Sequence, residues 1–173
     1  VTQAHVVIGC EGLSATDPAG PTMSVLLSVL GGSMSSRLFQ EVREKRGLAY
    51  TTYAFDVAYS DTGTFGMYAG CSPDKVDEVE AIMRAQLEEL AAEGPTEEEM
   101  TRVRGQVRGG VVLGLEDNGS RMMRLGLSVI IGRYRPIDES LAEFDAVEAS
   151  DVRALAASLI IKLDCRALVL PAK

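Results

Sequence analysis

The 173-residue sequence predicts an α+β domain, with an antiparallel-rich sheet covered by helices on one face. Residues 50–59 and 64–71 each place successive side chains on alternating faces and flank a turn at 60–63, which is typical of an antiparallel hairpin. From residue 72 to 161, helical periodicity recurs in consecutive segments. A hairpin followed by a run of helices favours this class over alternating strand and helix units.

The N-terminal segments predict a strand and a short helix. Residues 3–11 form an apolar, strand-like run, and the Pro- and Gly-containing stretch 17–21 breaks the chain after it. The apolar residues 23–30 then predict a short buried helix that ends at residues 31–33.

A second helix is expected before the hairpin. Ser35 or Ser36 can cap its N-terminus, and it runs to about Arg46, where Gly47 stops it. Its apolar side consists of Leu38, Phe39 and Val42. In the hairpin that follows, one face of the first strand carries Tyr53, Phe55, Val57 and Tyr59, and the other carries Thr52, Ala54, Asp56 and Ala58. In the second strand, Phe65, Met67, Ala69 and Cys71 share a face.

The C-terminal half is predicted to be helical up to a last strand. Ser72 and Pro73 open a helix whose apolar positions are Val76, Val79, Met83, Leu87 and Leu90. Thr96 and Glu99 form a capping box for the next helix, which bears Met100, Val103, Val107 and Val111. Further helices are expected at about 120–131, 138–146 and 150–161, and a strand at 165–170.

Charge and composition limit which partners and which domain organisation are expected. The formal charge of −8 argues against a nucleic-acid partner, because phosphate binding needs clustered Lys and Arg. No apolar run approaches the length of about eighteen residues that a membrane helix needs, so no membrane association is expected. We expect residues 1–173 to form a single domain. Because Val1 is not a Met and a strand pattern begins almost at once, we expect a piece of a longer chain.

The metal-binding and nucleophilic residue types form no recognisable site. Cys10, Cys71 and Cys165 are far apart in apolar runs, so core positions are expected for them, in a reducing compartment. The only histidine, His5, has no second ligand at metal-binding spacing and is expected to be a packed or edge-strand residue. No G-x-S-x-G elbow is present. The sequence therefore predicts no metal and no catalytic residue in this chain.

A run of glutamates and a set of glycines are expected to have structural roles. Glu97, Glu98 and Glu99 open a helix, where their charge favours the N-terminus. Four glycines recur inside a helical stretch and are expected to permit close packing of a neighbouring helix. They are Gly105, Gly109, Gly110 and Gly114.

Residues 30–50, LGGSMSSRLFQEVREKRGLAY, closely resemble the C-terminal domain of pitrilysin-type zinc peptidases, such as the mitochondrial processing peptidase, the insulin-degrading enzyme and bacterial relatives. The likeness continues through DTGTF at 61–65, TEEE at 96–99 and GLED at 114–117. It implies one half of a clamshell metallopeptidase, in which two similar domains enclose a peptide. The zinc-binding H-x-x-E-H helix belongs to the first domain of such enzymes, and this sequence lacks it.

The resemblance therefore implies a substrate-binding half that processes peptides together with an N-terminal catalytic domain or partner subunit. Zinc would be bound by that missing half, and a homodimer or heterodimer is compatible. Localisation is expected to be cytoplasmic in a bacterium. One alternative is a non-catalytic scaffold or interaction subunit of the same fold, since the family also supplies core proteins to a respiratory complex. A third is a stand-alone peptide-binding module, which would need an intact cleft without any partner.

The resemblance assigns an Arg and a Tyr seven positions apart, which here are Arg43 and Tyr50. A phenol can donate a hydrogen bond to a developing oxyanion, and a guanidinium can hold peptide carbonyls. From spacing alone, a surface ion pair for Arg43 and a strand-edge position for Tyr50 would be the simpler interpretation. Gly31, Gly32 and Ser33 match a glycine-rich substrate loop in position but are much shorter, so a plain helix-ending turn stays open.

Overall fold

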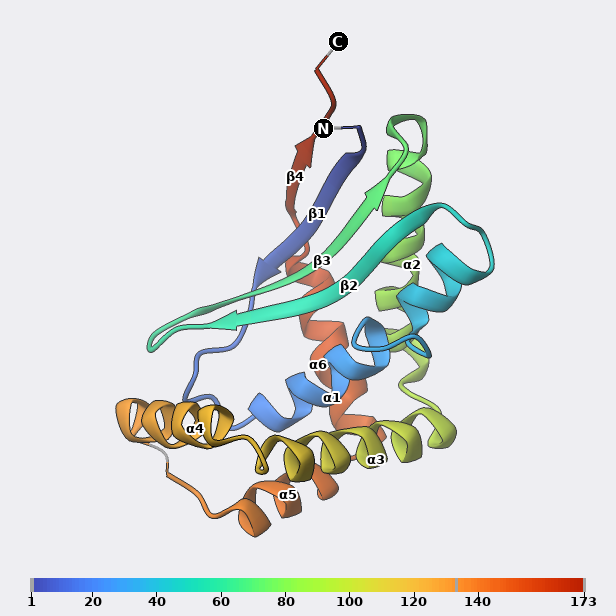
Figure 1. Ribbon diagram of the computed structural model, residues 1–173. Coiled ribbons are helices and arrows are strands. Elements are labelled where there is room, and N and C mark those ends of the chain that lie inside the picture. The colour runs from blue at the N-terminus through green and yellow to red at the C-terminus, as the bar shows by residue number, and fades with distance from the viewer. Residues whose placement is uncertain (1, 133, 173) are drawn as a thin grey trace.

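A single antiparallel sheet organises the molecule. The computed structural model describes residues 2–132 and 134–172 (Figure 1). The strands, in the sheet order β2-β3-β1-β4, are β2 (Ala49–Ala58), β3 (Gly63–Cys71), β1 (Ala4–Glu11) and β4 (Cys165–Val169). Every neighbouring pair is antiparallel, and β2 and β3 form the expected hairpin. The predicted α+β class is confirmed.

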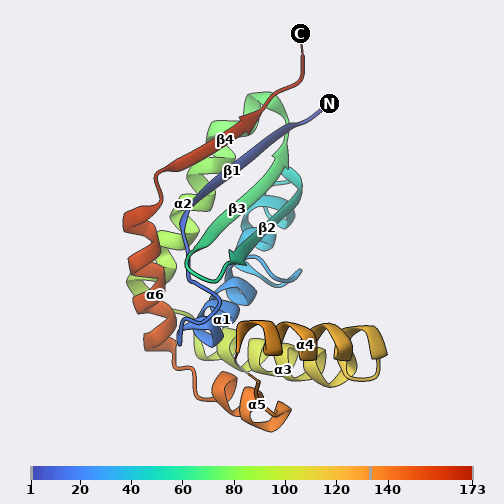
Figure 2. The same ribbon diagram turned by 90° about the vertical axis from the view of Figure 1, so that its left-hand side faces the viewer.

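Helices α2 and α6 pack on one face of this sheet, and no described helix lies over the opposite face (Figures 1 and 2). The helical elements are α1 (Gly20–Leu30), the π-helix η1 (Phe39–Glu44), the short 3₁₀ turn η2 (Pro73–Lys75), α2 (Val76–Glu93), α3 (Glu97–Gly114), α4 (Asn118–Ile131), α5 (Ile137–Asp145) and α6 (Ala149–Lys162). None of the described helices is long and apolar enough to cross a membrane.

The core lies between the sheet and its covering helices. Alternate residues of β1 and β3, among them Ile8 and Phe65, are fully buried. The predicted apolar face of α2 is buried as expected, from Val79 to Leu90. Each such side chain contributes about 1.5–3 kcal/mol of hydrophobic stabilisation. Replacing Leu87 by Ala would therefore be expected to cost about 2–5 kcal/mol.

The second predicted helix is present as the π-helix η1. The Lys45 N–H donates to the Gln40 carbonyl, five residues back, at 2.9 Å. Gly47 ends the segment with φ of 61°, a left-handed conformation that glycine adopts without steric cost. Apolar spacing did not reveal the π-helix, because that geometry is defined by hydrogen bonds between residues five apart.

Strand β2 carries a β-bulge at its start. Ala49 pairs with Cys71 and Thr51 pairs with Gly70, so Tyr50 is an extra residue with no cross-strand partner. A bulge bends the strand and redirects the side chain of the extra residue. Beyond the bulge the predicted alternation is confirmed, since Thr52 is buried and Tyr53 is exposed.

Some packing predictions hold and others are wrong. Cys10 and Cys71 are buried as expected, but Cys165 is exposed, because it begins edge strand β4 on the side of the sheet without helices. His5 is a packed residue of an interior strand: its Nδ1 lies 2.7 Å from the Tyr68 hydroxyl. The four glycines of α3 do not contact a neighbouring helix in the described chain, since nothing lies within 4 Å of where their Cβ atoms would be.

Candidate peptide-binding site

The structure brings Arg43 and Tyr50 together. The guanidinium carbon of Arg43 lies 4.8 Å from the ring centre of Phe39 and 5.0 Å from that of Tyr50. A cation over an aromatic ring at this range gains about 0.5–1 kcal/mol at an exposed site. The two rings therefore fix the position of the guanidinium at the start of β2.

The local backbone explains this arrangement. Phe39 and Arg43 are four residues apart in η1, so they share one face of the helix. The turn at Gly47 then folds the chain back, and the Leu48 N–H donates to the Val42 carbonyl at 2.9 Å. Tyr50 follows at the bulge of β2 and comes to lie against Arg43.

The Tyr50 side chain is exposed, and Arg43 is half-buried. Tyr50 is 72% exposed, and its hydroxyl has no hydrogen-bond partner among the described residues. Within the described chain the guanidinium of Arg43 likewise makes no ion pair or side-chain hydrogen bond. Stacking occupies the faces of a guanidinium and leaves its N–H groups at the edge. The pair thus presents one hydroxyl donor and several N–H donors at one place.

The neighbouring cations of this segment are engaged elsewhere. Lys45 and Arg46 both make ion pairs with Glu41. The hydrogen bonds from Lys45 and Arg46 lower the pKa of the Glu41 carboxyl below its ordinary value. Both cations are thus held by Glu41, and Arg43 is the cation beside Tyr50 that has no ion pair within the described chain.

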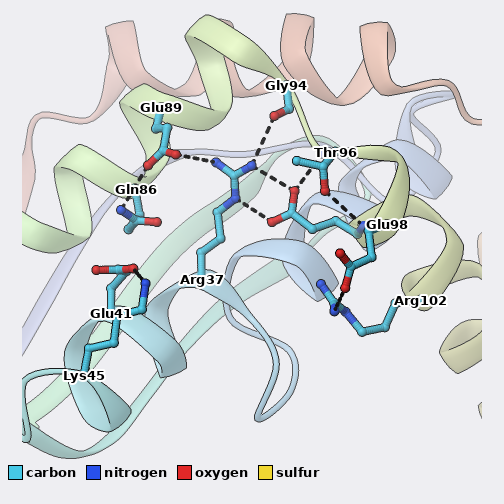
Figure 3. A network of polar contacts seen from close by, with 10 residues as sticks. Arg37, Glu41, Lys45, Gln86, Glu89, Gly94, Thr96, Glu98 and Arg102 are labelled. Carbon is cyan, nitrogen blue, oxygen red and sulfur yellow. Dashed lines mark hydrogen bonds and ion pairs between the residues drawn. The ribbon is translucent and has the colours of Figure 1, made fainter.

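A partly buried ion pair anchors the segment that leads into η1. Arg37 donates from Nε to Glu99 Oε1 at 2.8 Å and from Nη2 to Glu99 Oε2 at 2.9 Å, and Nη2 also donates to the Gly94 carbonyl at 3.2 Å (Figure 3). The remaining nitrogen, Nη1, lies 3.9 Å from Glu89. These contacts join the segment to the junction of α2 and α3.

In the ion pair of Arg37 and Glu99, each residue stabilises the charged form of the other. The hydrogen bond to Glu99 raises the pKa of Arg37. Burial disfavours the charged form of Glu99, but hydrogen bonds from Arg37 and Thr96 outweigh it and hold the pKa of Glu99 below its ordinary value. The same carboxylate completes the predicted capping box, since it accepts from the Thr96 N–H at 2.8 Å. Sequence analysis missed the ion pair because 62 positions separate its members.

The predicted loop residues lie beside β2 but not against the Arg43–Tyr50 pair. Gly31 is buried and ends α1, and a Cβ there would lie 2.2 Å from the backbone nitrogen of Ala54. Gly32 is exposed. Ser33 is half-buried, and its carbonyl accepts from the Ser36 hydroxyl at 2.6 Å. The loop is therefore a helix-ending turn, and its contact with a peptide stays a prediction.

An aromatic row on the open face of the sheet was not foreseen. The rings of Tyr53 and Tyr68 stack with centres 4.8 Å apart, and His5 stacks on Tyr68 at 6.0 Å. Next to them, the cross-strand pair Gly9 and Gly66 leaves a shallow apolar groove. Tyr53 was predicted on one face of the first hairpin strand. The strand register that aligns this face with Tyr68 and His5 does not follow from that pattern.

The described residues do not fit a zinc site. No group of three or more His, Cys, Asp and Glu side chains in that part of the chain is placed to hold a metal ion. His5 is hydrogen-bonded to Tyr68 and belongs to no such group among the described residues. The donors at the candidate site are a phenol and a guanidinium, which donate hydrogen bonds to carbonyl or carboxylate oxygens and are not the usual ligands of zinc.

Sequence comparison shows the family of this chain. It belongs to the family described as peptidase M16 inactive domain, which matches residues 1–107. An uncharacterized zinc protease of Streptomyces coelicolor is 48% identical over 159 residues, which are 91% of this chain and 35% of the relative. The chain spans about a third of the length of the first curated relatives.

Solved structures show the same fold. A protease from Helicobacter pylori superposes with a TM-score of 0.92 at 18% identity, over 99% of this chain and 42% of that one. A chain of complex III from Candida albicans superposes with a TM-score of 0.81 at 20% identity, over 97% of this chain and 42% of that one. At such identities the likeness concerns the fold alone.

Proposed function

We propose that this chain is the peptide-holding, non-catalytic half of a zinc-dependent metalloendopeptidase. The observation that carries the proposal is the contact between Arg43 and Tyr50, which presents two kinds of free donor at one exposed position. The family description as an inactive peptidase domain and the zinc-protease relatives support a role beside a catalytic half.

The two residues would act on different atoms of the peptide. The Tyr50 hydroxyl would donate a hydrogen bond to the oxygen of the scissile amide as negative charge develops there. The planar guanidinium of Arg43 would hold a neighbouring carbonyl or a carboxylate of the peptide. Neither group activates water, so cleavage requires another part of the protein.

Zinc would be held by that other part, where an H-x-x-E-H helix would supply ligands and a general base. The role of this chain is binding and orientation, since its own donor set does not fit the metal. A cytoplasmic location in a bacterium and a single-domain organisation of residues 1–173 are parts of the same proposal. A core shared by the sheet, α2 and α6 supports the single domain.

Complementation tests the proposal. The chain alone should not cleave peptides, and mixing it with a matching H-x-x-E-H half should produce cleavage that a zinc chelator abolishes. The control is the catalytic half alone at the same concentration. Chelator-sensitive turnover by this chain alone would refute the assignment, as would a catalytic half whose activity does not change when the chain is added.

A scaffold function is the second candidate. The fold is also that of a chain in complex III from Candida albicans, so the architecture by itself does not require proteolysis. Retention of Arg43 beside an exposed Tyr50 favours the peptidase, because a scaffold has no need of free donors there. A chain that binds the catalytic half without changing its activity would favour the scaffold.

A further inference from the structure

A hollow of about 430 Å³ separates helix α4 from the body of the domain. Its walls come from α1, the end of β2, α4 and α5, which are far apart in the sequence. In both views α1, α4 and α5 lie together at the end of the molecule below the sheet (Figures 1 and 2). A volume of this size falls within the range of about 300–1,000 Å³ that is usual for small-molecule sites.

Much of the wall of this hollow is apolar. Met23 of α1 is buried, and Phe144 of α5 is half-buried. On the α4 side, Leu127 and Ile131 line the hollow but stay 48% and 36% exposed. They lie four residues apart and therefore share one face of the helix. A ligand that covered them would be stabilised by about 25 cal/mol for each Å² of apolar surface removed from water.

Two acidic and two basic side chains also line the hollow. Arg135 and Glu143 form an ion pair, so their charges compensate each other within the chain. Arg124 of α4 donates from Nη2 to the Arg135 carbonyl at 2.9 Å and to the Ser140 hydroxyl at 3.2 Å, and both acceptors are uncharged. Asp56 of β2 makes no ion pair with any other residue that the structure describes. One positive and one negative charge are thus left without a charged partner.

The surroundings of Asp56 and Arg124 indicate what would bind there. Asp56 as a whole residue is exposed, but partial burial of its carboxyl group raises the pKa of that group above its ordinary value. A cation beside the carboxylate would favour the charged form again. Arg124 uses only Nη2 in the described chain, so its other N–H groups can donate to a carboxylate. The complement of this hollow therefore carries one ammonium group, one carboxylate and an apolar side chain.

We propose that this hollow is a binding site for a small zwitterion with a bulky apolar side chain, either a free amino acid or a short peptide. The α-ammonium would pair with Asp56, the α-carboxylate with Arg124, and the apolar side chain would cover Leu127 and Ile131. The inference goes beyond the proposed function, since it requires neither zinc nor a catalytic half. Asp56 follows Tyr50 by six positions, about 20 Å along an extended strand, so the two sites are separate.

Titration calorimetry of this chain with leucyl-leucine tests the site. The dipeptide should bind, and N-acetyl-leucyl-leucine and leucyl-leucine amide, which lack the ammonium and the carboxylate respectively, should bind at least about tenfold more weakly. Glycyl-glycine keeps both charges but lacks the apolar side chains, so it should also bind at least about tenfold more weakly. Free leucine is titrated in parallel. The tighter binder of leucine and leucyl-leucine shows whether the site takes an amino acid or a short peptide.

A matched pair of variants locates the binding in the hollow. Asp56→Asn removes the partner of the ammonium with little change in size, so the Kd for leucyl-leucine should rise at least about tenfold. Asp61→Asn removes the same charge from the turn between β2 and β3, outside the hollow, and should change this Kd by less than about twofold. Arg43→Lys, at the other site, should likewise leave the Kd unchanged.

Three results would overturn the zwitterion site. The first is that neither leucine nor leucyl-leucine binds. The second is that the acetylated or amidated dipeptide binds as tightly as leucyl-leucine, which would show that the hollow recognises apolar surface alone. The third is that Asp56→Asn leaves the affinity for leucyl-leucine unchanged. None of these results bears on cleavage by the assembled peptidase, so the proposed function and this site can fail independently.

Discussion

The guanidinium carbon of Arg43 lies 5.0 Å from the centre of the Tyr50 ring, although one residue belongs to a π-helix and the other to a strand. Three local features produce the contact: the wide turn of η1, the left-handed Gly47, and the bulge of β2. The contact places two donors together on the exposed start of an edge strand. Each prediction below depends on this geometry or on the packing that supports it.

The first prediction concerns Arg43→Lys in the assembled enzyme. Lys keeps the charge but loses both the planar fork and the stacking on Phe39 and Tyr50. We expect KM to rise by about tenfold, which corresponds to about 1.4 kcal/mol of lost binding, with a smaller fall in kcat. Steady-state kinetics on one peptide substrate measures both constants.

Arg46→Lys is the matched control for Arg43→Lys. Arg46 lies in the same short segment and pairs with Glu41 on the outside of η1. The substitution Arg46→Lys should change KM by less than about twofold from the parent value, because exposed ion pairs contribute about 0–1 kcal/mol. If Arg46→Lys impaired binding as much as Arg43→Lys, general positive charge would be the cause, and the specific role of Arg43 would be wrong.

Arg43 and Tyr50 were predicted from the motif at residues 30–50, but the contact between them was not predicted. Spacing along the chain gave Arg43 near a helix end and Tyr50 at the start of a strand. It did not give the stacking partner Phe39 or the bulge, because both depend on how the backbone turns at Gly47. Arg37 was inside the same motif, but its partner Glu99 lies on a distant helix, and only packing brings the two together.

The second prediction concerns the anchor of this segment. Glu99→Gln leaves the largely buried guanidinium of Arg37 without its charged partner, so we expect a loss of about 2–4 kcal/mol in unfolding free energy at pH 7. Glu98→Gln, at an 86% exposed side chain in the same turn, should cost less than about 0.5 kcal/mol. Chemical denaturation of the two variants and the parent measures the difference.

The same pair predicts a pH dependence. The pKa of Glu99 in the folded chain lies below its ordinary value of 4.5, so its contribution is complete above about that pH. It is lost as the pH falls through the folded-state pKa. The stability difference between the parent and Glu99→Gln should therefore shrink below pH 4.5. A difference that stays constant down to pH 3 would show that the lost packing, and not the charge, accounts for the effect.

The third prediction concerns the turn after α1. Gly31→Ala forces a Cβ to within 2.2 Å of the Ala54 backbone nitrogen, so strand and turn must separate. We expect a loss of about 1–3 kcal/mol in unfolding free energy, because overpacking is costly. Gly105→Ala, in open space within α3, should instead stabilise the isolated chain by about 0.5–1 kcal/mol. Thermal unfolding that ranks the two variants in the opposite order would contradict the close packing of Gly31 on β2.

Much of the fold followed from periodicity. The buried face of α2 and the faces of the β2–β3 hairpin lie where the pattern put them, since each depends only on spacing along one element. Cys165 was expected to be buried, but it is exposed. A neighbouring helix was expected to pack against Gly105, but none does so within the described chain. Both outcomes depend on which surfaces other elements cover. Sequence pattern alone does not show that one sheet face and the glycines of α3 stay open.

The most direct measurement is the kinetics of Tyr50→Phe in the assembled enzyme, beside the control Tyr59→Phe at the far end of β2. The Tyr50 hydroxyl would matter mainly once charge develops on the scissile carbonyl, so we expect kcat to fall by about 10²–10³ with KM nearly unchanged. Tyr59→Phe, which removes another exposed hydroxyl, should keep the parent activity. Combined with Arg43→Lys, the loss should be less than the product of the two single effects, because both groups orient the same bound peptide. Full activity of Tyr50→Phe on a peptide substrate would contradict the account and leave Arg43 and Tyr50 as a structural pair.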